Sequence, residues 1–149
     1  MKPPLPIRRS LAGPALLAFA TALGVAPGCA ANPTEIKTAR PGQAFTLRVG
    51  ESASVQGASL VIQFLEVAGD SRCPKGAQCV WEGDATVRIS VRRGTGPAEK
   101  QDLHTSSREP AAQAGAVHLV RLMRLEPQPV IDRAIQQAEY EATLEIDPA

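Results

Sequence analysis

A strict alternation of apolar and polar residues between residues 85 and 92 constrains the fold of this chain more than any other feature. The apolar positions are Ala85, Val87, Ile89 and Val91. Successive side chains of a β-strand point to opposite faces, so this spacing places all four on one face and their polar neighbours on the other. The segment therefore predicts a half-buried strand, which is typical of antiparallel sheets.

The same period recurs, less perfectly, through much of the chain after residue 43. Further strands are expected at residues 45–49, 52–55, 60–67, 100–105, 117–125 and 140–146. Residues 106–115 are expected to form a loop, and residues 131–138 are compatible with one or two helical turns. Short strands separated by turn residues predict an all-β domain, a single antiparallel β-sandwich or small barrel of about 6–7 strands.

The first 28 residues are typical of a secretory signal peptide. A basic start is followed by an apolar run over residues 11–25, and small residues close the segment at Gly28. The apolar run is too short to cross a bilayer as a permanent helix, which favours a signal over a membrane span. We therefore expect residues 1–28 to be removed on export.

Small residues stand directly before Cys29, and this arrangement resembles the bacterial lipobox, although Ala26 and Pro27 differ from the residues usual there. The resemblance implies that the Cys29 thiol receives a diacylglycerol and becomes the new N-terminus. Since the chain has three cysteines, lipidation of one leaves an even pair. The alternative is ordinary cleavage a few residues later, for instance after Ala30, which would give a soluble product.

The location and the domain boundaries follow from the anchor. The resemblance implies an exported chain held by its lipid at the cell envelope. Because Ala30 is not an aspartate, it further implies the outer membrane, facing the periplasm or the cell surface. Residues 29–42 contain two prolines and lack apolar periodicity, so we expect a flexible, lipid-anchored tether there. The β-sandwich domain is then expected to span residues 43–149.

The composition of the mature part argues against one class of partner. The signal contains three of the 16 Lys and Arg residues and none of the 15 Asp and Glu residues. The rest of the chain therefore carries more acidic than basic side chains. Nucleic-acid phosphates reward a basic surface, and the few aromatic residues cannot form a platform for stacking bases. We therefore expect no nucleic-acid partner.

The most distinctive segment is DSRCPKGAQCVWEGD, residues 70–84. In an exported protein, Cys73 and Cys79 are expected to form a disulfide. A ring of this size contributes about 2.4 kcal/mol, so the bridge shapes one loop and does not hold the fold together. Trp81 is expected to pack on the bridge or to cap the core. The candidate interaction residues of this loop are Arg72, Lys75, Gln78 and Trp81.

This segment resembles a group of bacterial secreted or lipid-anchored domains that carry S-R-C-P, then Q-C, then W-x-G between two strands. Pro127, Pro129 and the last strand with Tyr140 fit the same pattern, so the resemblance covers most of residues 44–147. It implies a β-fold and an envelope location, and it implies no particular chemistry.

Two kinds of metal site are conceivable in the same region. Zinc would need ligands beyond Cys73 and Cys79, and the two histidines, His104 and His118, lie far away in the sequence. Calcium would need the carboxylates of Glu66, Asp70, Glu82 and Asp84, but the cations of Arg72 and Lys75 lie among them, which favours solvated ion pairs. We expect neither metal nor any other cofactor.

Asp102, His104 and Ser106 have the side chains of a catalytic triad. On a strand these residues share one face, but neighbours are about 6.6 Å apart in a straight line that is open to water. A triad needs direct hydrogen bonds and an oxyanion site. A polar edge strand explains the three residues better, and His118 is expected to be a partly buried structural histidine. No catalytic residue is assigned.

These observations favour a non-catalytic binding or accessory lipoprotein that presents the Cys73–Cys79 loop to a protein or another envelope component. Its expected partners are the membrane, through the lipid anchor, and an envelope protein. The alternative is a small periplasmic hydrolase-like enzyme with a dispersed site. A deep pocket with convergent His104, His118 or carboxylates would favour the enzyme, and a protruding loop on a convex surface would favour the binder.

Overall fold

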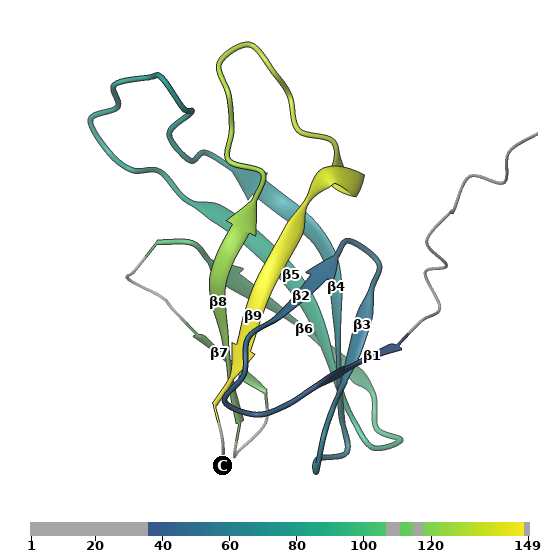
Figure 1. Ribbon diagram of the computed structural model, residues 1–149. Coiled ribbons are helices and arrows are strands. Elements are labelled where there is room, and N and C mark those ends of the chain that lie inside the picture. Colours follow the sequence, from purple (N-terminus) through teal and green to yellow (C-terminus); the bar gives the residue numbers. More distant parts are fainter. Residues whose placement is uncertain (1–35, 107–110, 115–117, 148–149) are drawn as a thin grey trace, which may run out of the picture. The chain divides into compact units, whose positions relative to one another are not determined.

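The computed structural model describes residues 36–106, 111–114 and 118–147. The signal, the lipidation site at Cys29 and the first part of the tether lie outside the described residues. Strands make up nearly all the regular structure (Figure 1). They are β1 (Ile36–Ala39), β2 (Phe45–Arg48), β3 (Ser52–Val55), β4 (Leu60–Asp70), β5 (Ala85–Arg93), β6 (Ala98–His104), β7 (Ala111–Ala114), β8 (His118–Glu126) and β9 (Glu141–Ile146), with a short 3₁₀ helix, η1 (Gln137–Glu139), before β9.

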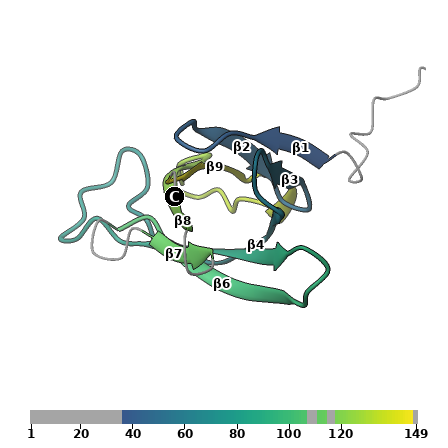
Figure 2. The ribbon, with the colours of Figure 1, turned by 90° about the horizontal axis from the view of Figure 1, so that it is seen from below.

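The strands form two sheets that pack face to face as a sandwich and do not close into a barrel. One sheet has the order β1-β3-β4-β5-β6, and the other has the order β2-β9-β8-β7. Seen from below, β1 and β2 lie near each other along one side, and β6 and β7 lie near each other along the other (Figure 2). The expected all-β sandwich is therefore confirmed.

The core lies between the two sheets and contains the alternating apolar residues. Along β5 every second side chain is buried, from Ala85 to Val91, and β9 alternates in the same way through Ala142, Leu144 and Ile146. Phe64 of β4 is completely buried among them. One face of each sheet is buried and the other is exposed to solvent. The alternation of apolar and polar side chains along a strand therefore fixes which face turns inward.

The two longest connections leave the sandwich at the same end. Asp70 pairs with Ala85 at the end of the β4–β5 hairpin, and Glu126 pairs with Glu141 at the end of the β8–β9 hairpin. Residues 71–84 join the first pair of strands and residues 127–140 join the second. Both loops lie at the top of Figure 1, and together they are called the loop end here. The distinctive segment of the sequence therefore belongs to this end.

The structure corrects the expected tether and one expected loop. Residues 36–39 are not a flexible tether, because β1 pairs in parallel with β3, from Ile36 opposite Ser52 to Ala39 opposite Val55. Ala39 is the one buried residue of β1, so the strand is held by backbone hydrogen bonds and leaves no apolar period in the sequence. The expected loop at 106–115 contains β7, which pairs with β8. Helical structure within 131–138 is limited to the start of η1.

Candidate functional site

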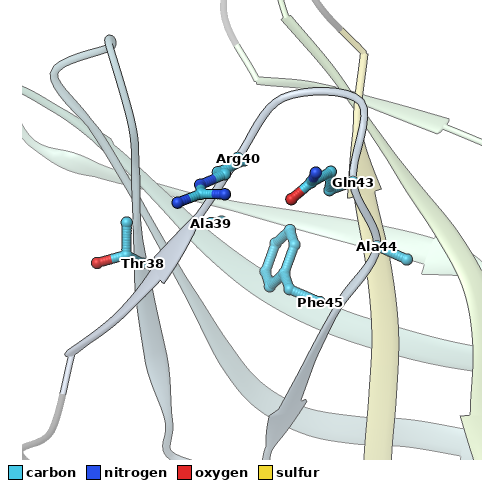
Figure 3. Close-up of a pocket in the computed structure, with 6 residues that line it drawn as sticks. All are labelled: Thr38, Ala39, Arg40, Gln43, Ala44 and Phe45. Atoms are coloured by element: carbon cyan, nitrogen blue, oxygen red, sulfur yellow. The ribbon is translucent and has the colours of Figure 1, made fainter.

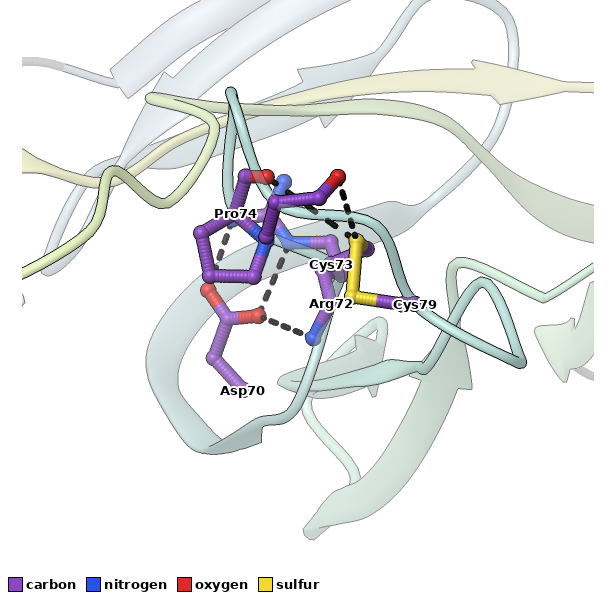
Figure 4. Close-up of a disulfide and its surroundings, with 6 residues drawn as sticks. Asp70, Arg72, Cys73, Pro74 and Cys79 are labelled. Atoms are coloured by element: carbon purple, nitrogen blue, oxygen red, sulfur yellow. Dashed lines mark hydrogen bonds and ion pairs between the residues drawn. A yellow bond between two sulfur atoms is a disulfide. The ribbon is translucent and has the colours of Figure 1, made fainter.

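A largely buried ion pair fixes the base of the loop end. The Arg72 guanidinium donates two hydrogen bonds to the Asp70 carboxylate, from Nε at 2.9 Å and from Nη2 at 2.7 Å (Figure 4). It also donates to the carbonyl oxygens of Leu125, at 2.6 Å, and of Pro127, at 2.8 Å. Both side chains are nearly buried, with 13% and 10% of their area exposed. Arg72 therefore joins the 71–84 loop to the end of β8, and its guanidinium is engaged in hydrogen bonds within the protein.

Tyr140 completes this polar clamp from the other side. Its hydroxyl donates a 3.0 Å hydrogen bond to Asp70 Oδ2, while its ring belongs to the buried core. Burial and the neighbouring Asp70 raise the pKa of Tyr140 to about 12. Burial alone would raise the pKa of Asp70, but the hydrogen bonds and the charge of Arg72, with the bond from Tyr140, outweigh this and lower it. The clamp therefore holds a carboxylate that stays ionised near neutral pH.

The neck of the 71–84 loop is narrow, and a glycine allows it. The Ser71 amide donates to the Asp84 carbonyl at 2.7 Å, and the Cys73 amide donates to the Glu82 carbonyl at 2.9 Å. Gly83 lies across from them with φ of +71°, and a Cβ there would come within 1.9 Å of the Ser71 carbonyl oxygen. The neck therefore requires glycine both for its backbone angle and for its close approach.

The expected disulfide between Cys73 and Cys79 is confirmed, with the two Cα atoms 6.0 Å apart. The loop that it closes is also fastened to the neighbouring connection. The Lys75 amide donates to the Pro129 carbonyl at 2.9 Å, and Lys75 forms an isolated bridge with Val130. The 71–84 segment is therefore held at its neck, across its middle and against residues 127–140.

Beyond these attachments, the loop presents large apolar side chains to solvent. Val80 is 91% exposed and Trp81 is 82% exposed. The expectation that Trp81 caps the core or packs on the bridge is therefore wrong, and the buried aromatic at this end is Tyr140, placed there by its bond to Asp70. An open hollow of about 560 Å³ lies beside the disulfide and has Trp81 in its wall. Lys75 and Gln78 are exposed on the same loop.

A second polar cluster lies beside the neck, around Asp84. His104 Nδ1 lies 2.6 Å from Asp84 Oδ2, and Asp84 Oδ1 accepts hydrogen bonds from the Thr105 hydroxyl and the Ser106 amide. Burial opposes ionisation of Asp84, but these hydrogen bonds prevail and lower its pKa. The sequence pattern does not reveal this cluster, because Asp84 directly precedes β5 and His104 is the last residue of β6.

The structure does not assemble the triad that the sequence spacing suggested. Asp102 forms an ion pair with Arg88, whose Nε lies 2.8 Å from Asp102 Oδ1, and the carboxylate beside His104 is that of Asp84. Ser106 meets the cluster through its backbone amide. His118 is partly buried, as expected.

Three of the four carboxylates near the loop are paired with other side chains, and the fourth, Glu82, is exposed. Glu66 pairs with Arg88, Asp70 with Arg72, and Asp84 with His104. Across residues 36–106, 111–114 and 118–147 there is no group of three or more metal-ligating side chains. The cysteines are consumed by the disulfide and cannot act as thiolate ligands.

Two further hollows are small and open. One, of about 270 Å³, lies where the chain turns from β1 into β2, and Figure 3 shows Phe45, Arg40 and Gln43 around it. The other, of about 310 Å³, lies at the loop end between Arg72, Glu82, Thr105 and Gln128. In neither do His104 and His118 appear among the lining residues.

No protein family, no curated protein and no solved structure matches the chain. Among the described residues there is no helix that is long and apolar enough to cross a membrane.

Proposed function

We propose that this chain is an exported, lipid-anchored envelope protein whose sandwich domain binds, without catalysis, through the 71–84 loop. One observation carries the proposal: Val80 and Trp81 are fully presented to solvent on a loop that a disulfide, a buried ion pair and backbone hydrogen bonds hold in place. Adjacent large apolar side chains that are exposed on a folded domain often mark an interaction site. A loop fixed in advance loses little conformational entropy when it binds.

The lipid anchor is the first part of the proposal to test. Mass spectrometry of the membrane-extracted protein is expected to show a chain that begins at an acylated Cys29. Cys29→Ala should release or mislocalise the protein. A soluble product that begins at Ala31 would contradict the anchor and leave the binding role of the loop to be judged separately.

The binding role of the loop is tested by affinity capture from envelope extracts. Lys75→Ala and Gln78→Ala change exposed side chains and should leave thermal unfolding almost unchanged, yet they should weaken capture of whatever the wild type retains. Lys100→Ala, an exposed lysine on β6, is the matched control and should capture like the wild type. If both loop variants capture normally, the loop has only an architectural role.

A small hydrolase-like enzyme is the second candidate, and the Asp84–His104 hydrogen bond is the observation that favours it. A carboxylate beside an imidazole can orient a general base. This candidate expects ester or amide hydrolysis by the wild type that is lost in His104→Gln. Equal rates for both proteins on a panel of such substrates would rule this candidate out.

A further inference from the structure

We propose that Val80 and Trp81, called the apolar tip here, insert into the lipid surface that carries the anchor, so that the domain meets the membrane at two points. This inference rests on the proposed function, because it names the lipid surface as the component that the 71–84 loop contacts. The tip would not replace the anchor. It would set the orientation in which the anchored domain rests on the membrane.

The direction of β1 supports this arrangement. β1 runs parallel to β3, and β3 runs antiparallel to β4, which ends at Asp70 where the loop begins. The first residue of β1, Ile36, therefore lies nearer to the loop end than its last residue, Ala39. Ile36 pairs with Ser52, and Ser52 pairs with Gln63 of β4. The seven residue steps from Gln63 to Asp70 extend β4 by about 23 Å toward the loop. The seven Cα steps between Cys29 and Ile36 can span at most about 25 Å, so the anchor reaches no further than the level of the loop base, and the domain has to lie tilted for the tip to meet the same surface.

The chemistry of the tip suits a bilayer interface. An indole ring combines a large apolar surface with one N–H donor, and tryptophan is enriched at the boundary between headgroups and acyl chains. The Asp70–Arg72 ion pair and the Asp84–His104 hydrogen bond at the base of the loop are formed within the protein. Lys75 and Glu82 form no ion pair with another described residue, and their charges balance each other. Lys75 is also long enough to keep its ammonium among the headgroups.

The size and spacing of the exposed apolar residues favour a lipid surface over a protein. Val80 and Trp81 offer about 300 Å² together, whereas a stable protein interface takes about 800 Å² from each partner. The next exposed apolar residues, Val130 and Ile131, are on the neighbouring connection, which contacts the 71–84 loop at Lys75. A fluid bilayer can accommodate separate apolar side chains without a complementary shape. Weak, partial insertion is sufficient because the lipid anchor already holds the domain at the membrane.

The chain contains its own reporter, because Trp81 is its one tryptophan. The acylated protein is extracted from the envelope and reconstituted into phosphatidylcholine vesicles, with and without brominated acyl chains. We expect the Trp81 emission to shift to shorter wavelength on reconstitution and to be quenched by the brominated lipid. Adding phosphatidylglycerol should change little, because the tip carries no net charge.

Two variants make the test specific. Val80→Ser keeps the reporter but removes half of the apolar tip, and it should lower the ratio of inserted to free tip by roughly threefold to tenfold. Met123→Ser is the matched control, because Met123 is 54% exposed on β8, and it should behave like the wild type. The inference is overturned if the emission and the quenching do not change on reconstitution, or if the two variants behave alike.

Failure of this inference can be told apart from failure of the proposed function. Trp81→Ser is compared with the wild type in affinity capture from envelope extracts. If vesicles leave the fluorescence unchanged but Trp81→Ser loses a captured protein, the loop binds a protein and the lipid contact is wrong. If the fluorescence is unchanged and capture is also unaffected, both the inference and the proposed binding role of the loop are wrong.

Discussion

The sandwich core and the loop end are stabilised by different means. In the core, strand side chains such as Phe64, Ile89 and Leu144 are completely buried, and apolar packing holds the two sheets together. At the loop end, a buried ion pair, a disulfide and a narrow backbone neck hold the chain, while Trp81 faces solvent. At the loop end Val80 and Trp81 are therefore left outside the core, although the chain around them is held in place. Those side chains remain available for a contact outside the molecule.

The largest effect is expected from a charge placed in the core. Ile89→Lys buries an unpaired ammonium between the sheets and should cost about 5 kcal/mol or more, enough to unfold many domains of this size. Arg92→Ala, on the exposed face of the same strand, should change the free energy of unfolding by less than about 0.5 kcal/mol. Urea unfolding of the two variants measures the difference, and equal stabilities would refute the described facing of β5.

The next largest effect should come from the clamp. Arg72→Ala leaves the Asp70 carboxylate nearly buried without its cation, and we expect a loss of about 4 kcal/mol. Arg48→Ala breaks the exposed pair with Glu141 and should cost less than about 1 kcal/mol. Urea unfolding of both variants at neutral pH checks this. Equal losses of unfolding free energy in the two variants would mean that the Asp70–Arg72 pair stabilises the protein no more than an exposed ion pair does.

A smaller effect is expected from the neck. Gly83→Ala must move the Ser71 carbonyl and adopt an unfavourable φ, which should cost about 3 kcal/mol. Gly42 has a similar φ of +74° but open space around it, so Gly42→Ala should cost about 1 kcal/mol. Thermal unfolding of both variants separates the contact from the backbone strain. If the two variants melt together, the close approach at Ser71 has no energetic weight.

The smallest of these stability effects should follow removal of the disulfide. The double variant Cys73→Ser and Cys79→Ser should stay folded and lose about 2.4 kcal/mol, because the bridge closes only a short ring. Intact mass with and without reductant should first show a difference of two protons in the wild type. If the double variant does not fold, the bridge stabilises the sandwich itself and not the loop alone.

The alternation of apolar and polar residues predicts the buried core residues. The features that it does not predict depend on contacts between residues far apart in the sequence. The alternation around Ile89 and Leu144 sets the facing of a strand by itself, and two cysteines this close in the sequence form a disulfide in an oxidising compartment. β1 escaped prediction because only Ala39 is buried there. Trp81 was misplaced because the choice of aromatic at the end of the core depends on the bond between Asp70 and Tyr140, which are 70 residues apart.

The most direct test of the central claim asks which end of the domain meets the envelope in living cells. A photocrosslinking amino acid is placed at Gln78 on the loop or, as a control, at Met123 on β8, since both positions are exposed. After illumination, mass spectrometry of the purified protein identifies any lipid or protein attached to it. We predict adducts at position 78 that are absent or much weaker at position 123. Equal labelling at the two positions, or no adduct at position 78, would contradict the account.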